Sequence, residues 1–101
     1  GRALLPADYL RQATTPRHAG GAPVFAPYGY LWWLSAERLA RGQTRGAIMA
    51  SGYGGQWLYV DPARGAAIAV TARRTPESAA RGQALALIRR DILPALPRPA
   101  Q

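Results

Sequence analysis

A period of two along the second half of the chain predicts β-strands. In QWLYVDP (56–62) the aromatic side chains of Trp57 and Tyr59 would share one face of a strand. In GAAIAVTAR (65–73) small residues alternate with Ile68 and Val70. The residues Asp61-Pro62-Ala63-Arg64-Gly65 predict a tight turn between these two stretches, because proline fixes φ for a type I turn and glycine takes the left-handed position after it. We therefore expect an antiparallel hairpin, preceded by a strand at AIMA (47–50).

YGYLWWLS (28–35) also has a period of two, with aromatic residues that suit a pleated surface, and predicts a strand covered on both faces. The segments 14–23 and 36–46 are rich in Gly, Pro and polar residues and predict loops.

A helical period marks the two ends of the chain. LLPADYLRQA (4–13) predicts a short helix with Pro6 at its first position. Thr75-Pro76-Glu77 begins a second helix by the rule of an N-cap followed by proline, and Pro94 ends it. The expected buried stripe of this second helix is Ala80, Ala84, Leu87, Ile88 and Ile92. Together the elements predict an α+β fold, with an antiparallel sheet of about three strands and the N- and C-terminal helices packed on it.

Charge raises one alternative function. All 13 basic residues are arginine, against 5 acidic residues, which gives a net charge of +8. Such a balance is compatible with a small basic α+β binding module for nucleic acid or another acidic partner. The arginines are dispersed from Arg2 to Arg98, however, whereas nucleic-acid binding is marked by clustering, so we favour no nucleic-acid partner.

The composition excludes several kinds of site. The chain has no cysteine, which excludes disulfides and thiolate nucleophiles and suits cytoplasm and periplasm equally. No apolar run reaches the roughly 18–20 residues of a membrane span, so we expect no membrane partner. Gly1 is not followed by the apolar core of a signal peptide, and we expect the chain to begin within a longer or processed protein.

The chain alone holds no complete set of catalytic residues. A serine nucleophile needs a base within hydrogen-bond reach. The serines are Ser35, Ser51 and Ser78, and the one histidine, His18, falls in a predicted surface loop. No metal-ligand spacing is present, and we expect neither a metal nor another cofactor.

Three glycines surround one tyrosine in ASGYGGQW (50–57). Glycine weakens a strand interior, so Gly52, Gly54 and Gly55 around Tyr53 suggest that another group approaches the backbone there. A glycine bulge without any ligand is the alternative.

The ordered set YGYLWW (28–33), ASGYGGQW (50–57) and VDPARG (60–65), followed by a terminal helix, resembles the C-terminal part of the serine β-lactamase and penicillin-binding-protein superfamily. It is most similar to the class C-like hydrolases that include esterases and 6-aminohexanoate-dimer hydrolases. The resemblance implies a piece of the β-lactamase/transpeptidase-like fold, in which a strand with a K-T-G-like triplet edges the active site.

The resemblance also implies roles for individual residues. Ala50-Ser51-Gly52 takes the position of the triplet, and the backbone N–H of Tyr53 would donate to the oxyanion hole. Ser51, Gly52, Gly54 and Gln56 would contact the substrate, a small ester or amide, and Gln56 would also orient the turn. Trp33 and Trp57 would line the pocket or belong to the core, and the core is the favoured place for both.

Two departures from the family pattern qualify this hypothesis. Ala50 stands where the triplet usually has lysine or histidine, which favours ester or amide hydrolysis over antibiotic hydrolysis. The chain has no lysine, so the nucleophilic S-x-x-K motif cannot occur in it, and Ser35-Ala36-Glu37-Arg38 ends in the wrong residue. We therefore expect residues 1–101 to be an incomplete C-terminal segment, inactive alone. Its expected partner is an upstream segment of the same fold, and an exposed apolar face would favour self-association.

Overall fold

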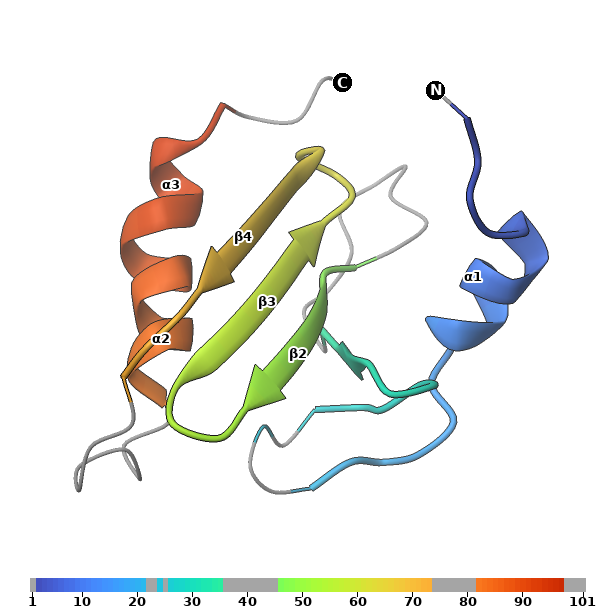
Figure 1. Cartoon of the computed structure of the whole chain (residues 1–101), viewed down its shortest axis with the longest axis horizontal. Coiled ribbons are helices and arrows are strands. Elements are labelled where there is room, and N and C mark those ends of the chain that lie inside the picture. Colours follow the sequence, from blue (N-terminus) through green and yellow to red (C-terminus); the bar gives the residue numbers. More distant parts are fainter. Residues whose placement is uncertain (1, 22–23, 25, 36–45, 74–81, 98–101) are drawn as a thin grey trace.

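The computed structural model describes residues 2–21, 24, 26–35, 46–73 and 82–97. In chain order its elements are α1 (Ala7–Ala13), β1 (Trp33–Leu34), β2 (Ile48–Gly52), β3 (Gln56–Asp61), β4 (Ala66–Val70), α2 (Gly82–Leu87), the π-helix η1 (Ile88–Ile92) and α3 (Leu93–Ala95). The strands form one antiparallel sheet in the order β1-β2-β3-β4 (Figure 1). The predicted α+β class is confirmed, with four strands in the described part of the chain where about three were expected.

The period of two predicted the two faces of the central strands correctly. Trp57 and Tyr59 on β3 are 6% and 1% exposed, whereas Leu58 and Val60 on the opposite face are half-buried. Tyr59 lies between Met49 of β2 and Ile68 of β4 in the register, so one row of apolar side chains crosses three strands.

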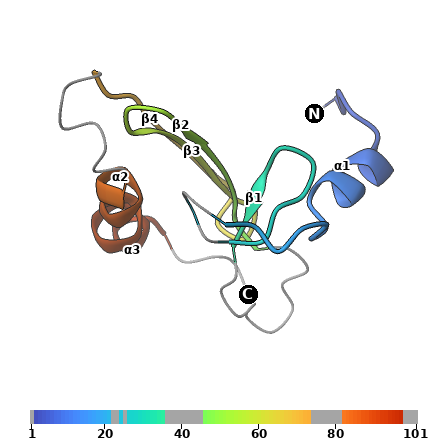
Figure 2. The same cartoon turned by 90° about the horizontal axis from the view of Figure 1, so that it is seen from below.

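The hydrophobic core lies between this face of the sheet and the C-terminal helical segment (Figures 1 and 2). Met49 and Ile88 are fully buried where the two layers meet. Trp57 belongs to this core and Trp33 packs against it, which confirms the favoured position of both tryptophans.

The predicted DPARG turn between β3 and β4 is confirmed. Gly65 has φ 62° and its N–H donates to the Pro62 carbonyl at 3.3 Å. Asp61 is 6% exposed, and its Oδ1 accepts from the backbone N–H groups of Ala63 and Arg64 at 3.0 and 3.2 Å. The Arg64 guanidinium also donates to Oδ2 at 2.6 Å, so this carboxylate belongs to the turn.

The C-terminal helix differs from the prediction at one position. Its predicted start at Thr75 and the stripe residue Ala80 lie outside the described residues. Leu87 was expected to be buried but is 42% exposed, whereas Leu85 and Leu93 pack on the core. The buried face is centred between positions 84, 85 and 88, and Leu87 lies about 100° away from that centre at the helical repeat.

A π-turn continues the buried face of this helix. The N–H of Leu93 donates to the carbonyl of Ile88, five residues earlier, which places both side chains on the same face. Pro94 has no N–H for the Arg90 carbonyl, so the regular α-helical bonding cannot continue there. The helix ends at Ala95, close to the predicted end.

The predicted strand at 28–35 is wrong over most of its length. Only Trp33 and Leu34 pair with β2, and Tyr28 forms isolated bridges with His18 and with Trp33. The N–H of Gly29 donates to the Trp32 carbonyl at 2.8 Å, which closes a tight turn between the two bridged residues. Leu31 at the tip of this turn has φ 62°. A Cβ at Gly29 would lie 2.2 Å from the Ala13 carbonyl oxygen, so contact with the end of α1 shapes this segment.

The N-terminal helix begins at Ala7, later than predicted, with Pro6 as its N-cap. It lies beside the sheet rather than on it, which corrects the expectation that it packs there (Figures 1 and 2). Ala13 is the only buried residue of α1, and the Ala13 carbonyl accepts from the Tyr30 N–H at 3.0 Å. The rings of Tyr9 and Tyr30 are 6.4 Å apart. None of the helices in the described part of the chain has the length and apolar character that crossing a membrane requires.

Candidate functional site

The glycine-rich segment forms the turn between β2 and β3. Gly52 and Gln56 are the last paired residues of these strands, and residues 53–55 make the connection. Gly54 and Gly55 have φ of 90° and 93°, a conformation that residues with a Cβ rarely adopt. These two glycines are therefore explained by the backbone of the hairpin itself.

Gly52 has a different reason to be glycine. A Cβ at this position would lie 3.0 Å from Cβ and 3.3 Å from Cγ of Gln56 on the facing strand. The group that approaches this backbone is thus the protein's own Gln56 side chain, so the three glycines by themselves do not indicate a ligand.

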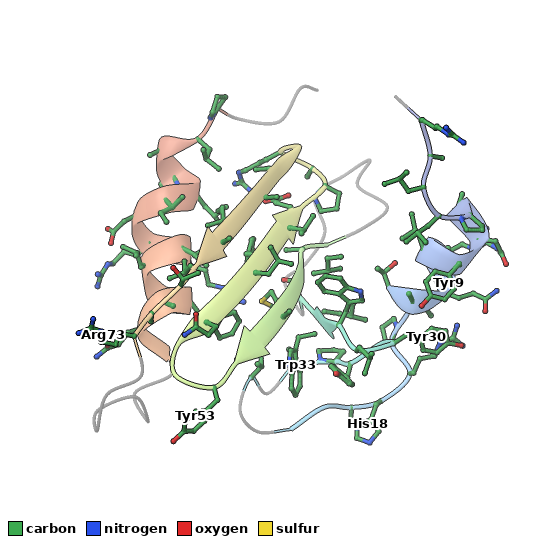
Figure 3. The ribbon with its side chains drawn as sticks, viewed as in Figure 1. Tyr9, His18, Tyr30, Trp33, Tyr53 and Arg73 are labelled. Carbon is green, nitrogen blue, oxygen red and sulfur yellow. The ribbon has the colours of Figure 1, made fainter. Side chains whose placement is uncertain are left out.

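Tyr53 occupies the exposed tip of this hairpin. Its side chain is 59% exposed, and Figure 3 shows its ring pointing away from the sheet. Leu31 is the one non-glycine residue with a positive φ in the described ranges, so the backbone of Tyr53 stays within the region open to any residue. Replacing Tyr53 therefore does not require a positive φ, which only glycine adopts easily.

Within the described residues, one edge of β2 has no paired strand directly before this turn. β1 has two residues, and it pairs only with Ile48 and Met49. Within the described ranges no strand pairs with Ala50, Ser51 or Gly52 on that side. In the described part of the chain β2 is therefore paired over only part of this edge, and an unpaired strand edge is a place where an extended segment can add.

The direction of the backbone groups on this edge follows from the alternation along a strand. The N–H of Ser35 donates to the Ala47 carbonyl at 2.9 Å, so the backbone polar groups of Ala47 face the β1 side. The backbone N–H and C=O groups of every second residue face the same side of a strand. The backbone groups of Met49 therefore face β1, and those of Ser51 face the same side beyond the end of β1. Ser51 therefore presents a backbone donor and acceptor to the open edge.

Gln56 connects this hairpin to the end of β4. Its Nε2 donates to the Ala72 carbonyl at 2.5 Å, and its Oε1 accepts from the Ala72 N–H at 3.1 Å. Sequence reasoning placed Gln56 near the substrate and missed Ala72. The strand register is the signal that finds it, because Ala72 falls opposite Gly55 when the pairing of Trp57 with Val70 is extended.

The other groups considered as catalytic do not gather at this turn. His18 lies on a separate loop, well apart from Tyr53 in Figure 3, and its Nδ1 accepts from the Gly20 N–H at 3.1 Å. Ser51 is half-buried and pairs with Trp57. Ser78, Glu37 and Glu77 lie outside the described residues.

The described carboxylates are engaged in local contacts. Asp61 holds its turn, Asp8 accepts from Arg11 and from Gln12, and Asp91 accepts from Arg90 at 3.3 Å. No group of three or more His, Cys, Asp or Glu that could bind a metal occurs in the portion of the chain that the structure describes.

The model of the β-lactamase family matches residues 1–91 of this sequence. The match covers most of the chain, including the whole sheet and its turns, and the protein therefore belongs to the β-lactamase family. In the same comparisons the chain matches no curated protein and no solved structure. The family defines a β-lactamase-related hydrolase segment, in agreement with the resemblance of the sequence motifs.

Proposed function

We propose that this chain is the C-terminal segment of a β-lactamase-related serine hydrolase that cleaves ester or amide bonds. In this proposal β2 is the strand beside the substrate, and the Tyr53 N–H donates to the oxyanion. Family membership supports the class of reaction. The observation that carries the assignment is the open edge of β2 at residues 50–52, which leads directly into the exposed turn of Tyr53.

The chemistry follows from these positions. The substrate lies along the open edge, where the backbone groups of Ser51 can pair with it as a neighbouring strand would. A serine of another segment attacks the carbonyl carbon while a base of that segment takes the serine proton, and the carbonyl π electrons move onto oxygen. The Tyr53 N–H stabilises that negative charge until the C–O or C–N bond breaks and the base returns the proton to the leaving alcohol or amine. Water then cleaves the acyl-enzyme by the same route.

The substrate contacts proposed for Ser51, Gly52 and Gly54 concern the backbone. Gly52 is exposed and carries no side chain between the strand end and a bound carbonyl. Gly54 is buried within the turn, and the side chain of Ser51 lies on the Trp57 face. Ala50 supplies no positive charge at the triplet, which favours uncharged substrates over those with a carboxylate. Trp57 is core and takes no part in this wall.

The nucleophile must come from outside these residues. The sequence contains no lysine and therefore no S-x-x-K motif. Arginine stays protonated and cannot replace that lysine as a general base. An upstream segment of the same fold is the partner that completes the site, and the chain alone is inactive.

Replacing Tyr53 with proline tests this proposal. The chain is joined to a nucleophile-bearing upstream segment of its family, and hydrolysis of a nitrophenyl ester is followed. Tyr53→Pro removes the N–H at a position without a positive φ, and we expect kcat to fall about 10²–10³-fold.

Tyr53→Ala is the matched control, since it removes the ring and keeps the N–H. It should retain most of the turnover. Equal activity of the proline variant and the wild type, with both folded by circular dichroism, would refute the role of this amide.

A further inference from the structure

We infer that Gln56 is a positioning residue, whose carboxamide fixes the Tyr53 turn against the end of β4 and does not itself contact the substrate. This inference rests on the proposed function. Of the two roles that the sequence suggested for Gln56, it keeps the orientation of the turn, assigns Ala72 as the partner, and drops the substrate contact.

Two hydrogen bonds carry the inference. The Gln56 carboxamide both donates to and accepts from the backbone of Ala72, at 2.5 and 3.1 Å. The backbone determines the orientation of the amide, because the Ala72 carbonyl can only accept and its N–H can only donate. With its nitrogen and its oxygen each engaged, this side chain is held in one rotamer.

The strand register explains why a side chain is needed at this point. Trp57 pairs with Val70, so Ala72 would face the backbone of Gly55 if both strands continued. Gly55 has instead turned into the hairpin with φ 93°. The Gln56 carboxamide, which has the same donor and acceptor as a peptide group, replaces the missing backbone partner of Ala72.

The turn also confines the Gln56 side chain on the side that faces Gly52. Gly52 packs against the Cβ and Cγ of Gln56 so closely that a Cβ at position 52 would require the Gln56 side chain to shift. Ala72 also lies against Gly55, with 3.5 Å between its Cβ and a Cβ built on that glycine. The Gln56 side chain therefore lies between Gly52, before the turn that carries Tyr53, and Ala72, which contacts Gly55 at the end of that turn. A rotation of the turn as a unit would break the two hydrogen bonds between Gln56 and Ala72.

A positioning role makes a specific kinetic prediction. Displacing an oxyanion donor weakens an interaction made only in the transition state, so kcat should fall while KM stays nearly constant. In the hydrolase joined to its nucleophile-bearing segment, we expect Gln56→Met to lower kcat by about tenfold to hundredfold, because misplacement by an ångström has costs of this order. KM should change less than about twofold, since substrate binding is not affected.

Gln56→Glu separates hydrogen bonding from packing. Its carboxylate can only accept and would repel the Ala72 carbonyl, whereas its protonated form donates and accepts like the amide. We expect kcat of this variant, relative to wild type, to be low at pH 8 and to recover toward wild type at pH 4, where most of a glutamate with an ordinary pKa is protonated. Gln83→Glu, at an exposed position of α2, is the matched control and should show no such pH dependence.

Hydrogen exchange of the same variants provides a readout independent of turnover. The Ala72 amide should exchange faster in Gln56→Met than in wild type, and the change should be absent in Gln83→Glu. Unchanged exchange at Ala72, or wild-type kcat in Gln56→Met, would overturn the inference. A Gln56→Glu variant equally impaired at both pH values would overturn it as well. A wild-type hydrolase without turnover would overturn the proposed function and this inference together, whereas an active wild type with unaffected variants overturns only this inference.

Discussion

At the scale of single residues, the glycines around Tyr53 have separate structural causes. Gly54 and Gly55 provide positive φ angles, and Gly52 leaves room for Gln56. The sequence indicated that something approaches the backbone here, but it could not show that the approaching group belongs to the same chain. That knowledge required the strand register, which pairs Gly52 with Gln56.

Gly55→Ala should destabilise the fold through the backbone. Its φ of 93° is unfavourable for alanine, and we expect a loss of about 1–2 kcal/mol in the free energy of unfolding. Gly21→Ala is the control, because its φ is not positive and nothing lies within 4 Å of an added Cβ. Urea denaturation measures both variants, and an equal midpoint for the two would contradict the assigned conformation of Gly55.

At the scale of elements, the sequence predicted what depends on local pattern. The strands β2, β3 and β4 and the DPARG turn follow from a period of two and from turn residues, and all are confirmed. The segment 28–35 has the same period, yet its shape is set by contacts distant in sequence, at Ala13 and His18. The family was likewise accessible from the ordered motifs, whereas the Gln56–Ala72 pair was not, because it joins residues across two strands.

The C-terminal helix allows a test between adjacent residues. Ile88 is fully buried and Leu87 is 42% exposed, although the helical pattern placed both on the core face. Ile88→Ala should lower the free energy of unfolding by about 2–5 kcal/mol, because it leaves a cavity between helix and sheet. Leu87→Ala should cost less than about 1 kcal/mol. Equal losses in thermal or urea unfolding would contradict the observed orientation of this helix.

At the scale of the whole molecule, exposed apolar side chains occur in and before α1 and in the turn at residues 30–31. We call this set the α1 surface: Leu4, Leu5, Tyr9, Leu10, Tyr30 and Leu31, which are between 37% and 89% exposed. The ring contact of Tyr9 with Tyr30 connects residues 4–10 of this set with the turn at residues 30–31, and Figure 3 shows both tyrosines on the same side of the molecule. A large exposed apolar surface commonly marks an interface, which agrees with the proposal that another segment completes the fold.

This surface should cause the isolated chain to associate. We expect the weight-average mass in sedimentation experiments to rise with concentration, because the apolar side chains of the α1 surface leave water when two copies meet. The double variant Leu5→Ser, Tyr9→Ser should reduce that rise, whereas Leu87→Ser, on an exposed position of α2, should not. A concentration-independent monomer would show that the α1 surface does not drive self-association.

The most direct test of the central claim is a crystal structure of the joined hydrolase after inactivation by a phosphonate ester, whose phosphoryl oxygen replaces the oxyanion. We expect this oxygen about 2.7–3.1 Å from the backbone nitrogen of Tyr53, with the inhibitor along residues 50–52 of β2. An oxygen bound elsewhere, with the Tyr53 N–H bonded to another protein group, would contradict it.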